Sequence, residues 1–280
     1  MKTLVEMIRE KDSCVCVGLD PVIENFPKEI RSRDTSVEDQ LVRFAQGVIE
    51  SATPYAVAMK PQIAFFEQYG LAGLQALRRI CSIIREAGLY LVMDAKRGDI
   101  GSTAAAYAKA FFTPGSDWES DALTVNGYLG SDGVLPFYQA AKARGGGVFV
   151  LVKTSNPSSS ELQDLLVEGV PVYEKMAALL DRIEPQTASN VLGAVVGATH
   201  PEELRRLRAL MPERVLLIPG YGAQGGTAED LRGAFGEDGC RAIVNSSRGI
   251  IYSYKKSDLP WREAIREATK EMKEALHAVR

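Results

Sequence analysis

Alternating charges make the segment Leu91–Ile100 the part of this sequence best suited to chemistry. Asp94 and Lys96 are two residues apart, so in a strand their side chains would point to the same side. Asp99 follows a glycine, which allows the chain to turn there. Lys60 ends an earlier apolar stretch and would bring a second ammonium group towards Asp94. The sequence therefore predicts a row of alternating charges in the order Lys60, Asp94, Lys96, Asp99.

Two interpretations fit such a row of charges. It could be a buried network of compensating ions that holds one end of the fold rigid. It also suits the removal of CO₂ from an anionic substrate, because the carbanion that remains needs a fixed cation beside it and then a proton. Lys96 could supply both, so the reaction would need neither a cofactor nor a metal. We predict a cofactor-free decarboxylase with Lys96 as its proton donor.

Eight short apolar runs, rich in β-branched residues, are typical of parallel strands covered by helices. They are Cys14–Leu19, Tyr55–Met59, Leu89–Met93, Ala122–Val125, Gly147–Val152, Leu192–Val196, Val215–Ile218 and Ala242–Val244. Helical periodicity is found over residues 1–11, Val37–Ser51, Ala72–Glu86, Ser102–Phe112, Gly133–Ala143, Ser160–Arg182, Pro201–Leu210, Ala228–Phe235 and Pro260–Val279. Strand alternating with helix predicts an α/β fold, a single (β/α)₈ TIM barrel with an N-terminal helix and extra helical segments. A doubly wound open sheet is the alternative.

The length of 280 residues matches one barrel, and no linker or charge block divides it. We expect one catalytic domain over residues 1–280. Barrel active sites form at the carboxyl ends of the strands. Polar residues follow nearly every predicted strand, and we expect them to converge there: Asp20, Lys60, Asp94, Lys96, Asn126, Lys153, Ser155, Gly220–Gln224 and Asn245–Arg248.

Glycine-rich segments follow the last two predicted strands, at Gly220–Gly226 and Asn245–Gly249. Loops in these two positions commonly build the phosphate site of a barrel, from backbone N–H groups and a helix N-terminus. Arg248 could also bind an anion through two hydrogen bonds. We therefore expect a phosphorylated substrate.

The run Asp94–Ile100 resembles the DxKxxDI signature of the orotidine 5′-phosphate decarboxylase family. Three further segments agree with that family, in its order: Val17–Pro21, Met59–Pro61 and Pro219–Gly226. The resemblance extends over roughly Cys14–Ser253 and is closest to the longer bacterial form of the enzyme. It implies the conversion of orotidine 5′-monophosphate to uridine 5′-monophosphate and CO₂ in pyrimidine biosynthesis, without a cofactor.

The resemblance also implies roles for the row of charges. Lys96 would protonate C6 of the pyrimidine after CO₂ leaves. Asp94 would lie against the departing carboxylate and orient the lysines. Lys60 and Asp20 would contact ribose hydroxyls.

Further residues take their expected roles from the same resemblance. Ser155 would bind the pyrimidine ring, while Gln224 and Arg248 would hold the 5′-phosphate. Asp99 and Thr103 resemble residues that reach into the site of the neighbouring subunit. This implies a homodimer with shared active sites.

Charge and composition limit the other partners. The formal net charge of −3 argues against nucleic acid or an anionic membrane as the main partner. No apolar run approaches the roughly 20 residues of a membrane span, and residues 1–11 have no signal-peptide core. The four cysteines lack the spacing of a metal site and are predicted to be buried thiols of a cytoplasmic protein.

Two other functions stay open. A Mg²⁺-dependent 3-keto sugar-phosphate decarboxylase or hexulose-phosphate synthase of the same barrel group would need carboxylates at strand ends. Here the second strand ends in Lys60 instead. A non-catalytic phosphate-binding barrel would have no need of the alternating row of charges.

Overall fold

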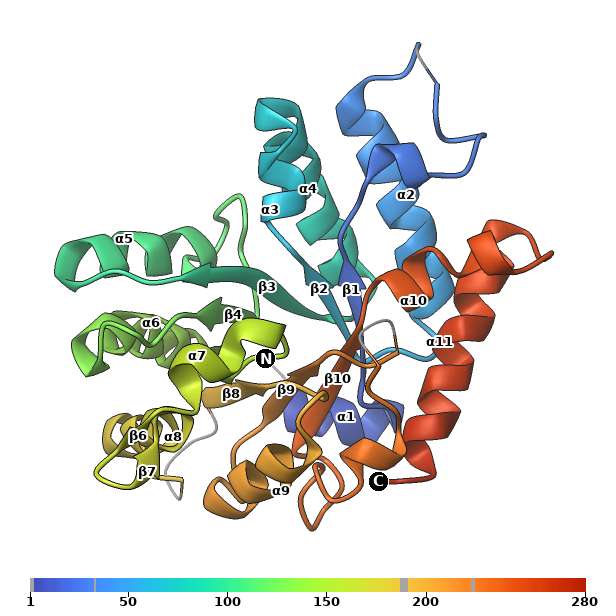
Figure 1. Cartoon of the computed structure of the whole chain (residues 1–280). Helices are drawn as coiled ribbons and strands as arrows, with labels where there is room; N and C mark the ends of the chain where they lie inside the picture. The colour runs from blue at the N-terminus through green and yellow to red at the C-terminus, as the bar shows by residue number, and fades with distance from the viewer. Residues whose placement is uncertain (1–2, 33, 187–190, 223–224) are drawn as a thin grey trace.

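A computed structural model of the chain describes residues 3–32, 34–186, 191–222 and 225–280. Within these residues, eight parallel strands close into a barrel that lies at the centre of Figure 1. Around the barrel the strands are β1 (Val15–Leu19), β10 (Ala242–Ser246), β9 (Leu216–Pro219), β8 (Leu192–Val196), β5 (Gly147–Lys153), β4 (Ala122–Val125), β3 (Tyr90–Arg97) and β2 (Ala58–Pro61). The predicted (β/α)₈ barrel is confirmed, and the doubly wound open sheet is wrong.

The pairing of β1 closes the barrel. Val15 pairs with Val244 of β10 on one side, and Cys16 pairs with Ala58 of β2 on the other. Every strand thus has two neighbours, and the sheet has no open edge.

Helices surround the barrel on all sides in Figure 1. The α-helices of the described residues are α1 (Leu4–Lys11), α2 (Val37–Ala52), α3 (Ala64–Glu67), α4 (Gly70–Glu86), α5 (Gly101–Phe112), α6 (Ser131–Arg144), α7 (Ser160–Gln163), α8 (Val172–Ile183), α9 (Pro201–Leu210), α10 (Arg248–Ile251) and α11 (Trp261–His277). Short 3₁₀ turns lie at Ile23–Asn25, Pro157–Ser159, Glu229–Leu231 and Ser253–Lys256. None of these helices is long and apolar enough to cross a membrane.

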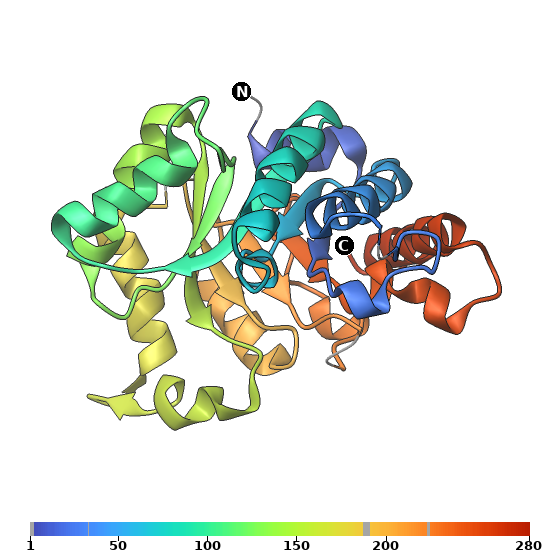
Figure 2. The ribbon, with the colours of Figure 1, turned by 90° about the horizontal axis from the view of Figure 1, so that it is seen from above.

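Apolar side chains pack in two layers. One layer lies between the strands and the outer helices. The other fills the barrel, where Val92 and Phe149 pack with Leu4 and Ile8 of α1. Figure 2 shows α1 at one end of the barrel and the yellow-green segment around α7 at the other. Since α1 packs at the amino ends of the strands, the larger of the two described cavities opens at their carboxyl ends.

The predicted helix Ser160–Arg182 is wrong as one element. It is divided into α7, a hairpin of β6 (Leu166–Val167) and β7 (Val170–Pro171), and α8. Glu168 and Gly169 both take positive φ, at 54° and 77°, which is the backbone of a two-residue hairpin turn. The apolar periodicity of the sequence runs through this turn and hides it.

The predicted helix Ala228–Phe235 is also wrong, since only the 3₁₀ turn Glu229–Leu231 forms there. Gly233 follows with a φ of 84° and ends the turn. Several strands run further than predicted, so Lys60 lies within β2, Asp94 and Lys96 lie within β3, and Asn245 lies within β10. These side chains are therefore held by the barrel sheet itself rather than by loops.

The four cysteines are buried and unoxidised, as predicted: Cys14, Cys16, Cys81 and Cys240. Burial raises the pKa of the Cys16 thiol to about 12 and that of the Cys14 thiol to about 11. Both are inert at neutral pH, because the thiolate is the reactive form.

Candidate active site

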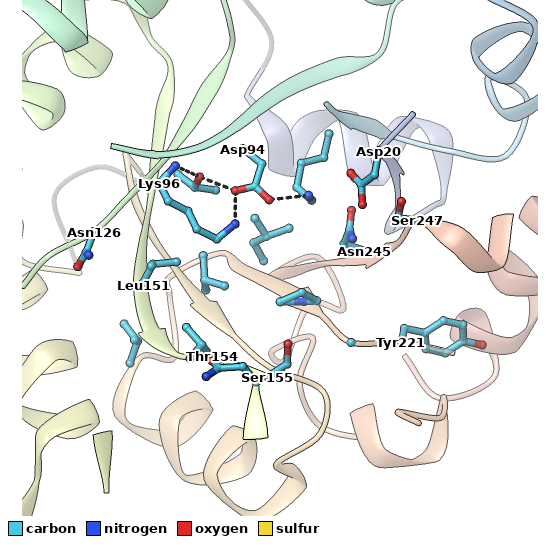
Figure 3. A pocket seen from close by; sticks show the side chains of 18 of the residues that line it. Asp20, Asp94, Lys96, Asn126, Leu151, Thr154, Ser155, Tyr221, Asn245 and Ser247 are labelled. Atoms are coloured by element: carbon cyan, nitrogen blue, oxygen red, sulfur yellow. Dashed lines mark hydrogen bonds and ion pairs between the residues drawn. The ribbon is translucent and has the colours of Figure 1, made fainter. Parts of the chain in front are cut away.

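A cavity of about 880 Å³ opens at the carboxyl ends of the strands. It brings together the majority of the residues that the sequence singles out, and Figure 3 shows how they face it. The predicted site residues that line it are Asp20, Lys60, Asp94, Lys96, Ser155 and Arg248. Lys153 is an exception among the strand-end residues. Its side chain is buried and pairs with Asp164, the residue that follows α7, instead of facing the cavity.

Asp94 is the centre of the charged row. Its Oδ2 atom accepts a hydrogen bond from Lys60 Nζ at 2.7 Å, and its Oδ1 atom accepts one from Lys96 Nζ, also at 2.7 Å. The Thr124 hydroxyl donates a third bond to Oδ1 at 2.8 Å. The carboxylate is thus fixed from three directions, as the dashed lines of Figure 3 show in part.

These contacts keep the Asp94 carboxylate and the Lys60 ammonium ionised. Burial alone would raise the pKa of the Asp94 carboxyl, but the charges and hydrogen bonds of Lys60 and Lys96 hold it well below its usual range. Burial would likewise lower the pKa of the Lys60 ammonium, whereas the charges of Asp94 and Asp20 raise it above its usual value. The buried pair of Asp94 and Lys60 is therefore a carboxylate and an ammonium group at neutral pH.

The two lysines differ in exposure. Lys60 is almost fully buried, with 6% of its side chain exposed, while 47% of the Lys96 side chain is exposed to the cavity. Lys96 also has a φ of 45°, in the left-handed region that a residue with a Cβ rarely adopts. Such backbone costs about 1–3 kcal/mol and is concentrated at functional sites. Of the two lysines, Lys96 is therefore the one that a ligand in the cavity can reach more readily.

Thr124 of β4 is a site residue that the sequence did not reveal. It is 1% exposed, it lines the cavity, and its hydroxyl contacts both Asp94 and the backbone of β3. In the sequence it is one β-branched residue within an apolar run, which is what any buried strand contains. The pairing of β3 with β4 is what places Thr124 next to Asp94.

The opposite side of the cavity is built from the ends of β1, β9 and β10. Figure 3 shows Asp20, Asn245 and Ser247 close to one another there. Among the described residues, Asp20 Oδ1 and Ser247 Oγ are buried without a hydrogen-bond partner. Arg248 is exposed at the rim, and its guanidinium has no partner within the described ranges. This side offers polar groups that a ligand can engage.

Two glycines follow β9 at this end of the cavity. Gly220 and Gly222 follow β9 with φ of 101° and 72°, so the chain turns there without a side chain projecting inward. Gly222 N–H donates to the carbonyl of Gly226 and folds the segment back on itself.

The end of β5 forms a third wall with α7. Thr154 N–H donates to Gln163 Oε1 at 2.9 Å, and Gln163 Nε2 donates to the Thr154 hydroxyl at 2.7 Å. Below them, Lys153 pairs with Asp164. These bonds tie α7 to β5 and hold Ser155 at the cavity wall.

Comparison with known proteins decides the family. A model of the "Orotidine 5′-phosphate decarboxylase / HUMPS family" matches residues 13–258. The chain belongs to this family. It is 43% identical to the orotidine 5′-phosphate decarboxylase of Rhodopirellula baltica over 94% of each chain. It is 42% identical to that of Deinococcus radiodurans, over 90% of this chain and 89% of the relative.

Solved structures of the family have the same fold. The OMP decarboxylase of Leishmania donovani is similar to this chain with a TM-score of 0.81 and 33% identity, over 99% of this chain and 98% of the other. The match reaches across the whole barrel. The family resemblance of the sequence is therefore confirmed.

Two of the described residues that the family resemblance singled out, Asp99 and Thr103, do not line the cavity of their own chain. Asp99 is half-buried after β3, where it accepts a hydrogen bond from Ile100 N–H at 2.8 Å. Thr103 is exposed on α5. Gln224 lies outside the described residues.

Proposed function

We propose that this chain decarboxylates orotidine 5′-monophosphate to uridine 5′-monophosphate and CO₂. One observation carries the proposal. In a cavity of about 880 Å³, the Asp94 carboxylate, whose two oxygens both accept hydrogen bonds, lies beside the partly exposed ammonium group of Lys96. Membership of the family and the named bacterial relatives support it.

In the proposed reaction, the substrate carboxylate lies beside Asp94. The bond between C6 and the carboxylate carbon breaks, CO₂ leaves, and the electron pair stays on C6. The Lys96 ammonium stabilises the carbanion by its charge and then donates a proton to C6. Lys96 becomes a neutral amine, which water reprotonates. Because Lys96 Nζ is already held at 2.7 Å from Asp94 Oδ1, it needs no reorganisation at the moment of reaction.

The remaining residues bind the nucleotide. Lys60 and Asp20 both line the cavity and would contact the ribose hydroxyls, as the resemblance implies. Ser155 faces the cavity from β5 and would bind the base, while Arg248 would bind the 5′-phosphate. Gln224 would join Arg248 at the phosphate, as the resemblance implies.

Orotidine 5′-monophosphate offered to the purified protein in EDTA tests this function. We expect uridine 5′-monophosphate and CO₂ in equal amounts. No turnover, or turnover that requires added Mg²⁺, would contradict the proposal.

A metal-dependent reaction of the same barrel group has less support in this site. A magnesium ligand needs free carboxylate oxygens, whereas both oxygens of Asp94 already accept bonds from lysines. Within the described part of the chain, no three His, Cys, Asp or Glu residues are grouped as metal ligands. A protein that only binds phosphate would not need the charges of Lys60, Asp94 and Lys96 to be held against one another in the cavity.

We also propose that the chain works as a homodimer with shared sites. Large apolar side chains are exposed on α5, on α6 and on the turns before them: Ile100, Tyr107, Tyr128, Leu129 and Leu135. Helices α5 and α6 pack against each other and lie side by side in Figure 1, so these residues belong to neighbouring elements. Asp99 and Thr103 lie on the same elements. A second copy on this face would cover the apolar side chains and bring Asp99 to the partner's cavity.

Subunit exchange tests the shared site. Inactive Lys96→Ala dimers are mixed with inactive Asp99→Ala dimers. In a mixed dimer, one site then carries both substitutions and the other carries neither. Random pairing should restore about a quarter of the wild-type activity. If subunit exchange is demonstrated and no activity returns, Asp99 serves its own subunit and the shared-site proposal is wrong.

The four buried, unoxidised thiols suit a reducing compartment. We therefore propose that the enzyme acts in the cytoplasm.

A further inference from the structure

The Thr124 hydroxyl uses its whole hydrogen-bonding capacity within the described site. A hydroxyl can accept two hydrogen bonds and donate one. Thr124 Oγ1 accepts from Ala95 N–H at 3.0 Å and from Lys96 N–H at 2.9 Å. Its proton is therefore free only for Asp94 Oδ1, which lies at 2.8 Å. Since the two accepted bonds polarise the hydroxyl, they strengthen the bond it donates.

These three bonds lie at an irregularity of the barrel. The pairing of β3 with β4 is regular up to Met93, which pairs with Leu123, and then shifts, so that Arg97 pairs with Val125. Ala95 and Lys96 lie in this shift, and their N–H groups find the Thr124 side chain in place of a backbone carbonyl. Lys96 takes its positive φ at the same place.

One side chain thus fixes both partners of the central ion pair. It holds the Asp94 carboxylate by a donated bond, and it holds the Lys96 backbone in the conformation that brings Nζ to Asp94. Valine has nearly the same shape but has neither donor nor acceptor. It would leave two buried N–H groups unpaired and would release Asp94 Oδ1 on one side.

We propose that Thr124 is a positioning residue, which acts on the proposed decarboxylation by holding Asp94 and Lys96 in their reactive arrangement. It does so through its hydroxyl, and its methyl group contributes only packing. The proposal rests on the proposed function for its kinetic consequence. Its structural consequence, the protection of two backbone N–H groups, does not depend on that function.

The kinetic test compares Thr124→Val, Thr124→Ala and Thr124→Ser with Thr269→Val as the control. Thr269 is also fully buried, and its hydroxyl bonds only to the Ile265 carbonyl within α11. We expect kcat for orotidine 5′-monophosphate to fall by about tenfold to a hundredfold in Thr124→Val and Thr124→Ala, the size of a lost hydrogen bond to a charged group. KM should change much less, Thr124→Ser should recover most of the loss, and Thr269→Val should keep the wild-type kcat.

Several outcomes would overturn the proposal. Wild-type kcat in a folded Thr124→Val variant would show that the hydroxyl is not needed. A Thr124→Ser variant no better than Thr124→Ala would show that the loss comes from packing. A change confined to KM would make Thr124 a binding residue. If Thr124→Val does not fold, the alanine and serine variants make the same comparison. Both lack the methyl group of threonine, so they differ only in the hydroxyl.

Hydrogen exchange at Ala95 and Lys96 tests the same proposal without turnover. Both N–H groups should lose protection in Thr124→Val and Thr124→Ala, and should keep it in Thr124→Ser and Thr269→Val. Unchanged protection in Thr124→Val would contradict the proposal even if the wild type were active. If the wild type were inactive on orotidine 5′-monophosphate, the proposed function would fail, and the exchange result alone would decide the role of Thr124.

Discussion

The two sides of the cavity are built differently. On the side of β2, β3 and β4, both oxygens of Asp94 are bonded within the chain, to Lys60, Lys96 and Thr124. On the side of β1, β9 and β10, Asp20 Oδ1 and Ser247 Oγ have no partner among the described residues, and Arg248 is exposed. We refer to the first as the reacting side and to the second as the phosphate side.

This difference suits the two tasks that we propose for these sides. Charge that develops at C6 is best stabilised by groups that are already in place, because reorganisation during the reaction would raise the barrier. Phosphate, by contrast, carries its charge before and after the reaction. Its binding can draw an exposed arginine into place, and that binding energy can be used elsewhere in the site. Substitutions on the two sides should therefore alter different kinetic constants.

The largest effect is expected from Lys96→Ala. General acid catalysis contributes about 10²–10⁴-fold, so kcat should fall by at least about a hundredfold. Binding of uridine 5′-monophosphate should persist, because the phosphate side is unchanged. Steady-state kinetics and calorimetric titration measure the two quantities, with Lys270→Ala on α11 as the control. A variant that retains more than about a hundredth of the wild-type kcat would remove Lys96 from the role of proton donor.

Arg248→Ala should act mainly on affinity. Loss of a charged hydrogen-bonded contact weakens binding by about 2–5 kcal/mol, so uridine 5′-monophosphate should bind at least about 30-fold more weakly. Uridine, which has no phosphate, should bind as it does to the wild type. Titration of both ligands measures this, and Arg266→Ala, an exposed arginine of α11, is the control. Equal losses for the two ligands would place the phosphate elsewhere.

The smallest effect is expected from Ser155→Ala. A neutral hydrogen bond contributes about 0.5–1.5 kcal/mol, so both uridine and uridine 5′-monophosphate should bind about two- to tenfold more weakly. The two losses should be equal because the base is common to both ligands. Ser158→Ala changes an exposed serine of the same segment and serves as the control. A loss seen only with the phosphorylated ligand would assign Ser155 to the phosphate.

The sequence allowed the barrel and the row Lys60, Asp94, Lys96 to be predicted, because both depend on local pattern. Parallel strands appear as apolar runs, and the side chains at their carboxyl ends converge once the barrel closes. The contacts that depend on register could not be predicted in this way. Thr124 reaches Asp94 at the point where the pairing of β3 with β4 shifts by two residues.

The two wrong helices have a similar cause. Apolar residues at helical spacing extend across Ser160–Arg182, but Glu168 and Gly169 form a tight turn inside it. Turn residues interrupt a pattern without altering its period, so periodicity alone does not detect them. The buried role of Lys153 was missed for the same reason, since its partner Asp164 lies on the misassigned segment.

Crystal structures of the protein alone and with uridine 5′-monophosphate test the contrast between the two sides most directly. The account predicts that the bonds of Asp94 to Lys60, Lys96 and Thr124 are the same in both, within about 0.5 Å, the tolerance of a preorganised site. Arg248 and Ser247 should gain hydrogen bonds to the nucleotide only in the complex. An Asp94 cluster that forms only when the nucleotide binds, or an Arg248 that makes no contact with the phosphate, would contradict the account.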